Sequence, residues 1–440
     1  MIKKLKFKNK YAKHFFLLSI VTLIVKGLGF LKEIMIADYF GTSLELDMLL
    51  LSLNFTGTIL LIFSNGIEST LLPNYLKFKN INQEMTNSYL FAFFIILILI
   101  NIFIYFFMIF FSNDIIKIIA PGFSSQSIIQ TNVFLKIFVW FLIFSFLSSF
   151  FIAILKAENK FLYAGSVPAL ISLSIIILLF FFHSFGVIII AYAFIIGSIL
   201  QLIFLLSKTM KYLSYKNIII SKLKVFYKDI IKNYFILISS GLFIGLIGLT
   251  DQSFATLAGQ GAVSSLNYAQ KFPALIESFL VMVLGTIMFT KFSENNAHKK
   301  YELNKKLYIK TMKFIFIITI LISLILSYFS KTIIEILFLH GKFNLKSLYI
   351  VYPVQTIFLL KLPFITLSVL SARMMNSFEL NSQMLYINII SFLLNLILDY
   401  VLVVNYGLIG IAYSTLFVYI LATILNHYVV IKHFNRIVRV

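Results

Sequence analysis

Five lysines lie inside long apolar runs of this 440-residue chain, where charged side chains are rare. An ammonium group at the centre of a membrane helix costs about 2.5–3.5 kcal/mol on insertion scales, so lysines at such positions usually have a function. Lysine also binds phosphate well, as a point charge. We therefore expect a cationic, water-filled cavity with a phosphate-bearing guest, lined by Lys26, Lys32, Lys136, Lys271 and Lys361.

The alternative for each lysine is snorkelling, in which the aliphatic stem lies in lipid and the ammonium group reaches the membrane surface. This alternative suits lysines close to the end of an apolar run. It suits Lys26 and Lys361 poorly, because they lie about twelve and about fourteen residues into their runs. Glu33 follows Lys26 by seven residues and so shares its helix face, whereas Lys32 lies well around the helix.

A second group of polar side chains carries carboxylate, amide and hydroxyl oxygens in the second half of the chain. Asn395 and Asp399 are four residues apart and share a helix face. Asp251 and Thr415 are predicted at a similar depth in the membrane. Hard oxygen ligands suit a hard cation such as Na⁺. The alternative is a buried polar cluster that joins three helices, and spacing alone leaves both open.

Membrane helices must position these residues, because 60% of the chain is hydrophobic and only 12% is charged. The charged share is about half that of soluble proteins. The apolar runs are long and do not alternate, which predicts an all-α polytopic membrane protein rather than a barrel. The first run has no small-residue cleavage site after it, so we interpret it as an uncleaved span. Twelve spans are predicted, near 14–38, 46–72, 86–111, 128–155, 162–183, 186–207, 232–256, 262–290, 307–329, 347–372, 382–403 and 407–431.

The basic residues are divided unequally between the two sides of the predicted membrane. The N-terminus, every second loop and the C-terminus hold 28 of the 37 lysines and arginines, and the alternate loops hold four. This positive-inside pattern places both termini in the cytoplasm. The net charge of +21 therefore faces anionic lipid and sets topology, and we expect no nucleic-acid partner.

The two halves of the chain resemble each other at a nearly constant offset. Gly41 and Gly259, 218 residues apart, open the second and eighth spans, and Asn159 and Asn376 follow the fourth and tenth. This predicts two parallel six-helix lobes around a central cavity, an architecture of transporters. The predicted lobes are residues 1–207 and 232–440, and residues 208–231 form a basic cytoplasmic linker.

Motifs of the common enzyme classes are absent from the sequence. There is no H-E-x-x-H, no G-x-S-x-G and no Walker loop, and the chain has no cysteine. We therefore expect a protein that is not an enzyme.

The segment VKGLGFLKEIMIADYFGTSLELD, which begins at Val25, resembles the first-span motif of the MurJ/MviN lipid II flippases of the MOP exporter superfamily. Lys26 and Lys32 stand where that family has two arginines, and Glu33 and Asp47 stand where it has acids. Lys271, in the segment SSLNYAQKFPALIES, takes the place of a further essential arginine. The resemblance implies that these residues contact the substrate, and that the lobes have the fold of the MATE transporters of the same superfamily.

The resemblance also bears on the polar group in the second half. Some members of the family bind Na⁺ with residues at matching spacings, which implies a Na⁺ site formed by Asp251, Asn395, Asp399, Ile411 and Thr415. Three departures are present: Leu60 replaces a second-span arginine, lysine replaces arginine at three sites, and the family usually has fourteen spans. They leave open a relative that moves another polyprenyl-linked glycan.

Together these features predict a flippase that moves a polyprenyl-diphosphate-linked oligosaccharide across a bacterial inner membrane by alternating access. Lipid II is the first candidate for this substrate. The implied partners are this lipid-linked substrate, anionic membrane lipids and cell-wall synthesis proteins, and Na⁺ is the implied coupling ion. The alternatives are a flippase for O-antigen or capsule units, a drug/cation antiporter of the MATE type, and a polytopic enzyme or scaffold. The antiporter predicts a cavity dominated by acids, whereas lysines dominate here.

Overall fold

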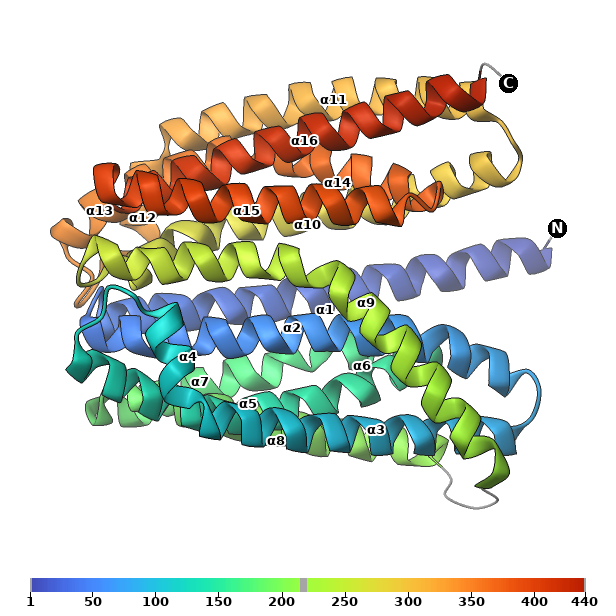
Figure 1. Cartoon of the computed structure of the whole chain (residues 1–440), viewed down its shortest axis with the longest axis horizontal. Coiled ribbons are helices and arrows are strands. Elements are labelled where there is room, and N and C mark those ends of the chain that lie inside the picture. The colour runs from blue at the N-terminus through green and yellow to red at the C-terminus, as the bar shows by residue number, and fades with distance from the viewer. Residues whose placement is uncertain (1, 214–219, 439–440) are drawn as a thin grey trace. The chain divides into compact units, whose positions relative to one another are not determined.

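The computed structural model describes residues 2–213 and 220–438, and regular structure within these residues is entirely helical (Figure 1). The chain divides into two compact units. The first contains Met1–Phe40, Met48–Ile118 and Ser124–Gly245, and the second contains Gly41–Asp47, Ile119–Phe123 and Leu246–Val440. Two short segments from the first half of the sequence thus belong to the second unit.

The first half of the chain folds into long helices joined by short turns. In the first unit, α5 packs against α8, α7 packs against α8, and α1 packs against α7. The helices are α1 (Ile2–Phe40), α2 (Leu44–Lys79), α3 (Gln83–Phe110), α4 (Ser112–Ile119), α5 (Ser125–Ala157), α6 (Phe161–Ser166), α7 (Pro168–Phe182) and α8 (Ile188–Thr209), with 3-10 turns at His183–Phe185 and Met210–Tyr212.

The second half repeats this arrangement of long helices. In the second unit, α15 packs against α16, α10 against α14, and α14 against α16. The helices are α9 (Ile220–Ala255), α10 (Ala262–Ala297), α11 (Tyr301–Tyr328), α12 (Ser330–Phe338), α13 (Leu345–Leu360), α14 (Leu362–Ser377), α15 (Asn381–Tyr406) and α16 (Leu408–Val438), with a 3-10 turn at Thr256–Ala258.

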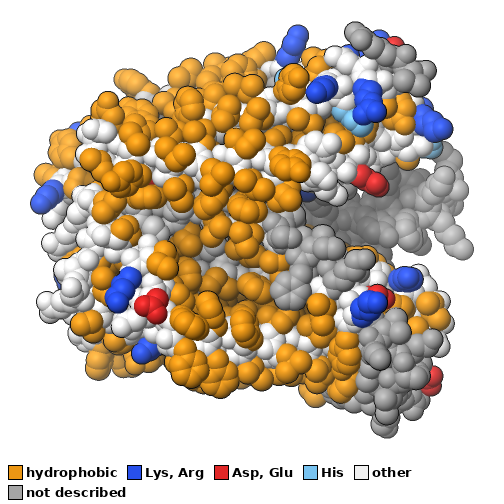
Figure 2. Space-filling model, viewed as in Figure 1, with side chains coloured by type: hydrophobic (Ala, Val, Ile, Leu, Met, Phe, Trp, Pro, Cys, Tyr) orange, Lys and Arg blue, Asp and Glu red, His pale blue; other side chains and the backbone are white. Residues whose placement is uncertain are grey.

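The helices have the length and composition of membrane spans. In the described part of the chain, nine helices or helix pairs are long and apolar enough to cross a bilayer. The remaining three predicted spans lie in α1, α9 and α10, which have 39, 36 and 36 residues. Figure 2 shows hydrophobic side chains over the middle of each unit and Lys and Arg toward its ends. The prediction of an all-α membrane protein is confirmed.

The boundary between the units differs from the predicted one. Residues 208–231 were expected to form a linker loop, but α9 is helical from Ile220 onward, and the division falls after Gly245. Phe226, Ile230 and Tyr234 of α9 are buried in the core of the first unit, which explains why the first part of this helix belongs there. Residues 214–219 of the predicted linker lie outside the described residues.

The tenth predicted span is interrupted at Lys361, between α13 and α14. Pro363 has no backbone N–H to donate to the carbonyl of Leu359, so the helix ladder is broken there. The hydroxyl of Ser323 on α11 donates to that carbonyl at 2.8 Å. A freed backbone group inside a membrane protein needs such a replacement partner. Lys361 itself keeps helical backbone angles, so it lies at a junction where one helix hydrogen bond is replaced by a bond from a neighbouring helix.

Candidate functional site

In the first unit, Lys32 forms an ion pair with its neighbour on α1, Glu33. The ammonium nitrogen lies 2.7 Å from a carboxylate oxygen of Glu33, and the two side chains are 16% and 9% exposed. The same nitrogen lies 5.4 Å from the ring centre of Phe194 on α8, within cation–π range. Lys26, seven residues before Glu33 on the same helix, is partly buried.

The placement of Lys136 differs from that of the other four lysines. It is exposed on α5 and shares a helix face with Val133 and Trp140, which are exposed apolar side chains. Such a face suits lipid, so snorkelling explains Lys136 without a role in binding. This residue serves below as a control.

In the second unit, Lys271 and Lys361 are partly buried within the membrane helices. Lys271 lies on α10, two residues before Pro273. The ammonium group of Lys361 lies 5.0 Å from the ring centre of Tyr419 and 5.2 Å from that of Phe358. Lys361 also interacts electrostatically with Glu277 of α10, an acid that the sequence analysis missed. The sequence could have indicated Glu277, because it is an acid within a predicted span.

Asp47 has a structural role in the second unit. Its carboxylate accepts backbone N–H groups of Gly261 at 2.6 Å and Ser264 at 2.7 Å, so it caps the start of α10. Asp47 is fully buried. Both of its oxygens are therefore engaged in this state, and the expectation that Asp47 contacts substrate does not fit the observed geometry.

The segment that carries Asp47 packs closely against other parts of the second unit. Gly41 has φ +56°, and a β-carbon there would lie 2.5 Å from the carbonyl oxygen of Lys342. Its own carbonyl accepts a hydrogen bond of 3.1 Å from the hydroxyl of Tyr268. The hydroxyls of Thr42 and Ser347 are 2.7 Å apart. Glycine is needed at this turn because both the backbone angle and the lack of space exclude a side chain.

The predicted cation ligands converge in the second unit. The amide of Asn395 donates to Asp251 at 3.0 Å, and the hydroxyl of Thr415 donates to the other oxygen of Asp251 at 3.0 Å. The carbonyl of Ile411 accepts a hydrogen bond from Thr415 at 2.9 Å. Asp399 lies one turn after Asn395 on α15. The structure thus brings α9, α15 and α16 together at one polar cluster.

Two further members of this cluster were not predicted. The hydroxyl of Thr250 donates to the side-chain oxygen of Asn395 at 2.5 Å, and the hydroxyl of Ser414 lies 3.4 Å from its side-chain nitrogen. Each directly precedes a predicted ligand in the sequence. Adjacent helical residues point in different directions, so spacing alone gave no reason to include them.

The chemistry of this cluster fits a hard cation. Both carboxylate oxygens of Asp399 are buried without a hydrogen-bond partner among the described residues, and the side chain is fully inaccessible. A buried carboxylate without partners is costly unless it is protonated or neutralised by a cation. With Asp251, Asn395, Thr415 and the carbonyl of Ile411, it forms a set of hard oxygen ligands of the kind that Na⁺ prefers.

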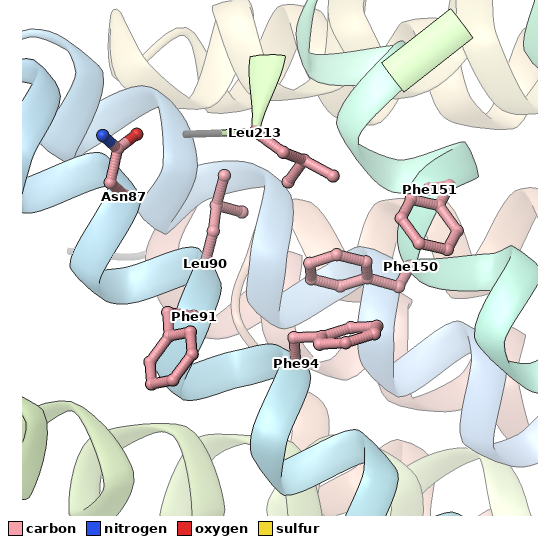
Figure 3. Close-up of a pocket in the computed structure, with 7 residues that line it drawn as sticks. All are labelled: Asn87, Leu90, Phe91, Phe94, Phe150, Phe151 and Leu213. Carbon is pink, nitrogen blue, oxygen red and sulfur yellow. The ribbon is translucent and has the colours of Figure 1, made fainter. Parts of the chain in front are cut away.

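A small pocket of the first unit, drawn in Figure 3, is not a substrate site. Phenylalanine and leucine side chains line most of it, with Asn87 at one end. Its volume of about 20 Å³ holds one or two water molecules. A glycan or diphosphate group does not fit there.

The sequence comparisons with known proteins agree on one family. The family described as "Lipid II flippase MurJ" matches residues 36–438. A probable lipid II flippase MurJ of Buchnera aphidicola subsp. Acyrthosiphon pisum is 30% identical over 344 residues, which are 74% of this chain and 65% of that protein. The chain thus spans slightly less than two thirds of this relative's length.

Solved structures show the same fold. One described as "Lipid II flippase MurJ, inward closed conformation" has a TM-score of 0.82 at 25% identity, covering 96% of this chain and 90% of that one. An inward-facing MATE multidrug transporter of the MOP superfamily has a TM-score of 0.77 at 14% identity, covering 96% and 99%. The predicted MATE-like fold is confirmed.

Proposed function

The chain belongs to the lipid II flippase MurJ family, and on this premise we propose that it moves lipid II, a polyprenyl-diphosphate-linked glycan, across the bacterial inner membrane. The observation that carries the proposal is the set of amines held within the helices of a chain of this family. Lys26 lies in the first unit, and Lys271 and Lys361 lie in the second. Unlike Lys136, which is exposed, all three are partly buried.

These amines have the chemistry that a diphosphate requires. Each carries a compact positive charge on a flexible stem, which can follow a phosphate group as helices move. Partial burial strengthens the attraction, because the effective dielectric constant is lower there than in water. Translocation breaks no bond, so the proposed activity needs no nucleophile or general base. The glycan and the diphosphate would cross between the lobes while the polyprenyl chain stays in lipid.

The polar cluster of the second unit is the proposed site of a coupling cation. The ion Na⁺ would be held by Asp251, Asn395, Asp399, Thr415 and the carbonyl of Ile411, and its single charge would offset one of the two buried carboxylates. Bound Na⁺ would supply a positive charge whose movement down its gradient can drive the cycle. Because the cluster joins α9, α15 and α16, its occupancy would change how these helices pack. We further propose cytoplasmic termini, as the distribution of basic residues indicates.

Native mass spectrometry of the purified full chain tests whether the substrate binds. Lipid II is the probe, and an undecaprenyl-linked O-antigen unit is the competitor. We expect lipid II adducts that the O-antigen unit displaces poorly, and adducts that Lys26→Ala and Lys271→Ala lose while Lys136→Ala keeps them. Preferential binding of the O-antigen unit would reassign the substrate, and equal loss in all three variants would remove the proposed role of the amines.

A further inference from the structure

Lys361 lies where α13 meets α14, in the middle of the second unit. Both of these helices pack against α10 and against α16. The hydroxyl of Ser323 on α11 donates to the carbonyl of Leu359 at 2.8 Å, next to the junction, and so anchors the backbone there. The Lys361 side chain therefore starts from a fixed point among helices of which α10 carries Glu277 and α16 carries Thr415.

The ammonium group of Lys361 lies about one helical turn from the proposed cation site. Thr415 donates to the carboxylate of Asp251 at 3.0 Å, and Tyr419 follows Thr415 by four residues on the same face of α16. The ammonium nitrogen of Lys361 is 5.0 Å from the ring centre of Tyr419. Lys361 and Asp251 accordingly interact electrostatically, although Lys361 is not a ligand of the site.

A second acid shares this ammonium group. Glu277 of α10 interacts electrostatically with Lys361, and the phenol of Tyr419 interacts with both Glu277 and Asp251. Lys361 and Glu277 are partly accessible, whereas Asp251 is 2% exposed. The ammonium group thus lies between a closed group of cation ligands and a more open part of the same unit.

The empty cation site needs a positive charge nearby. A buried carboxylate that nothing compensates is costly, and Asp251 and Asp399 are both buried. Lys361 supplies part of this compensation from a distance, because charges act over a longer range in a partly buried site than in water. A cation bound at the ligands would supply it more directly and would be repelled by the ammonium group. Occupation of the site and the attraction of Lys361 to Asp251 therefore oppose each other.

We propose that Lys361 is a resident counter-charge that competes with the coupling cation for Asp251 and thereby sets the affinity of the cation site. The proposal rests on the proposed function, because it requires the cluster to bind Na⁺. Lys361 acts as a positioning residue, through its charge, and Glu277 remains its partner when a cation occupies the site. An anion that engages Lys361 would weaken its hold on Asp251 and raise the affinity for Na⁺, which couples the two ligands.

The affinity for Na⁺ tests this role without any substrate. Melting temperatures of the full chain are measured in detergent while NaCl replaces choline chloride at constant ionic strength. Lys361→Met should lower the Kd for Na⁺ about tenfold, because the repulsion between two unit charges in a partly buried site is removed. Lys361→Arg keeps the charge and should bind Na⁺ much as the wild type does. Lys136→Met, at an exposed lysine, is the matched control and should leave the Kd unchanged.

The outcomes separate this proposal from the proposed function. A lower Kd in Lys361→Met alone supports it, as does a Lys361→Met chain that folds only in NaCl. A wild type that Na⁺ stabilises, with an equal or higher Kd in Lys361→Met, would overturn this proposal and leave the cation site in place. A wild type that Na⁺ does not stabilise would overturn both, whereas the binding of lipid II would be judged separately by mass spectrometry.

A double-mutant cycle provides a second measurement that needs no cation. Lys361→Met, Asp251→Asn and their combination are melted in choline chloride. The loss in the double variant should be smaller than the sum of the two single losses, because Lys361 loses its partner when Asp251 is neutral. Strictly additive losses would show that the two charges do not act on each other and would overturn the proposal.

Discussion

The side-chain amide of Asn395 donates a 3.0 Å hydrogen bond to the carboxylate of Asp251, joining α15 to α9 within the second unit. The same carboxylate accepts a hydrogen bond from Thr415 of α16. Asp399, one turn along α15 from Asn395, has no hydrogen-bond partner among the described residues. The cluster therefore contains a second buried acid close to Asp251.

Asp399→Asn should abolish stabilisation by Na⁺. An ion that binds only the folded chain stabilises it by about 2.7 kcal/mol at one hundred times its Kd. We expect the wild type to melt at a higher temperature in NaCl than in choline chloride of equal ionic strength, and Asp399→Asn to show no difference. Glu302→Gln, at an exposed acid, is the control. An equal effect of Na⁺ on wild type and Asp399→Asn would place the ion elsewhere.

Asp47→Ala should destabilise the folded chain. The substitution leaves the N–H groups of Gly261 and Ser264 without their acceptor, and loss of a helix cap costs about 1–2 kcal/mol. The expected result is a lower melting temperature, read by thermal denaturation in detergent. Glu45→Ala lies in the same turn of α2 but at an exposed acid, and it should melt as the wild type does. Equal melting of all three proteins would remove the structural role of Asp47.

Lys26→Ala should weaken binding of a lipid diphosphate by about 10- to 100-fold, because a hydrogen bond to a charged group contributes about 1.5–3 kcal/mol. Lys26→Arg keeps the charge and should bind within a few-fold of wild type. A titration of undecaprenyl diphosphate followed by native mass spectrometry measures both. If Lys26→Ala binds as the wild type does, this lysine does not contact the phosphates.

Stability should also depend on pH through Glu158, which follows α5 outside the membrane-spanning segments. Burial raises the pKa of Glu158, but hydrogen bonds from Lys79 and Tyr75 outweigh it and hold the pKa below the ordinary value of 4.5. The folded state thus binds this proton less readily than the unfolded state does. The stabilisation is complete above about pH 4.5 and is lost as the pH falls through the lower folded pKa.

The test compares melting temperatures at pH 7 and in the acidic range for wild type and Glu158→Gln. At pH 7 the melting temperature of the variant should be lower than that of the wild type. The difference between the two melting temperatures should become smaller as the pH falls. Because the Lys79 side chain is 43% exposed, solvent screening keeps this effect small. A difference in melting temperature that grows in acid would contradict the lowered pKa of Glu158.

Much of this architecture could be predicted from local pattern. The apolar runs located the spans because bilayer thickness sets the length of a membrane helix. The offset between Gly41 and Gly259 identified the repeat because both glycines precede equivalent helices. The spacing of Asn395 and Asp399 placed them on one face, and their convergence with Asp251 is observed. These predictions depend on the sequence near each residue.

Contacts between distant segments could not be read in this way. The capping of α10 by Asp47 joins residues 214 positions apart in the sequence, and a motif that includes Asp47 does not tell which group it contacts. The Lys32 ammonium group, which pairs with Glu33, also lies 5.4 Å from the ring centre of Phe194 on α8, far away in the sequence. The boundary inside α9 depends on where Tyr234 is buried. Tertiary packing decided each of these features.

The central claim is that amines within the membrane helices carry a lipid diphosphate across the bilayer. The direct measurement is lipid II accessible on the outer face of a bacterium whose own flippase has been depleted, with this chain supplied in its place. The account predicts that the wild type and Lys136→Ala restore exposure and that Lys26→Ala and Lys271→Ala, present at equal levels in the membrane, do not. Full restoration by Lys26→Ala and Lys271→Ala, or no restoration by a folded wild-type chain, would contradict it.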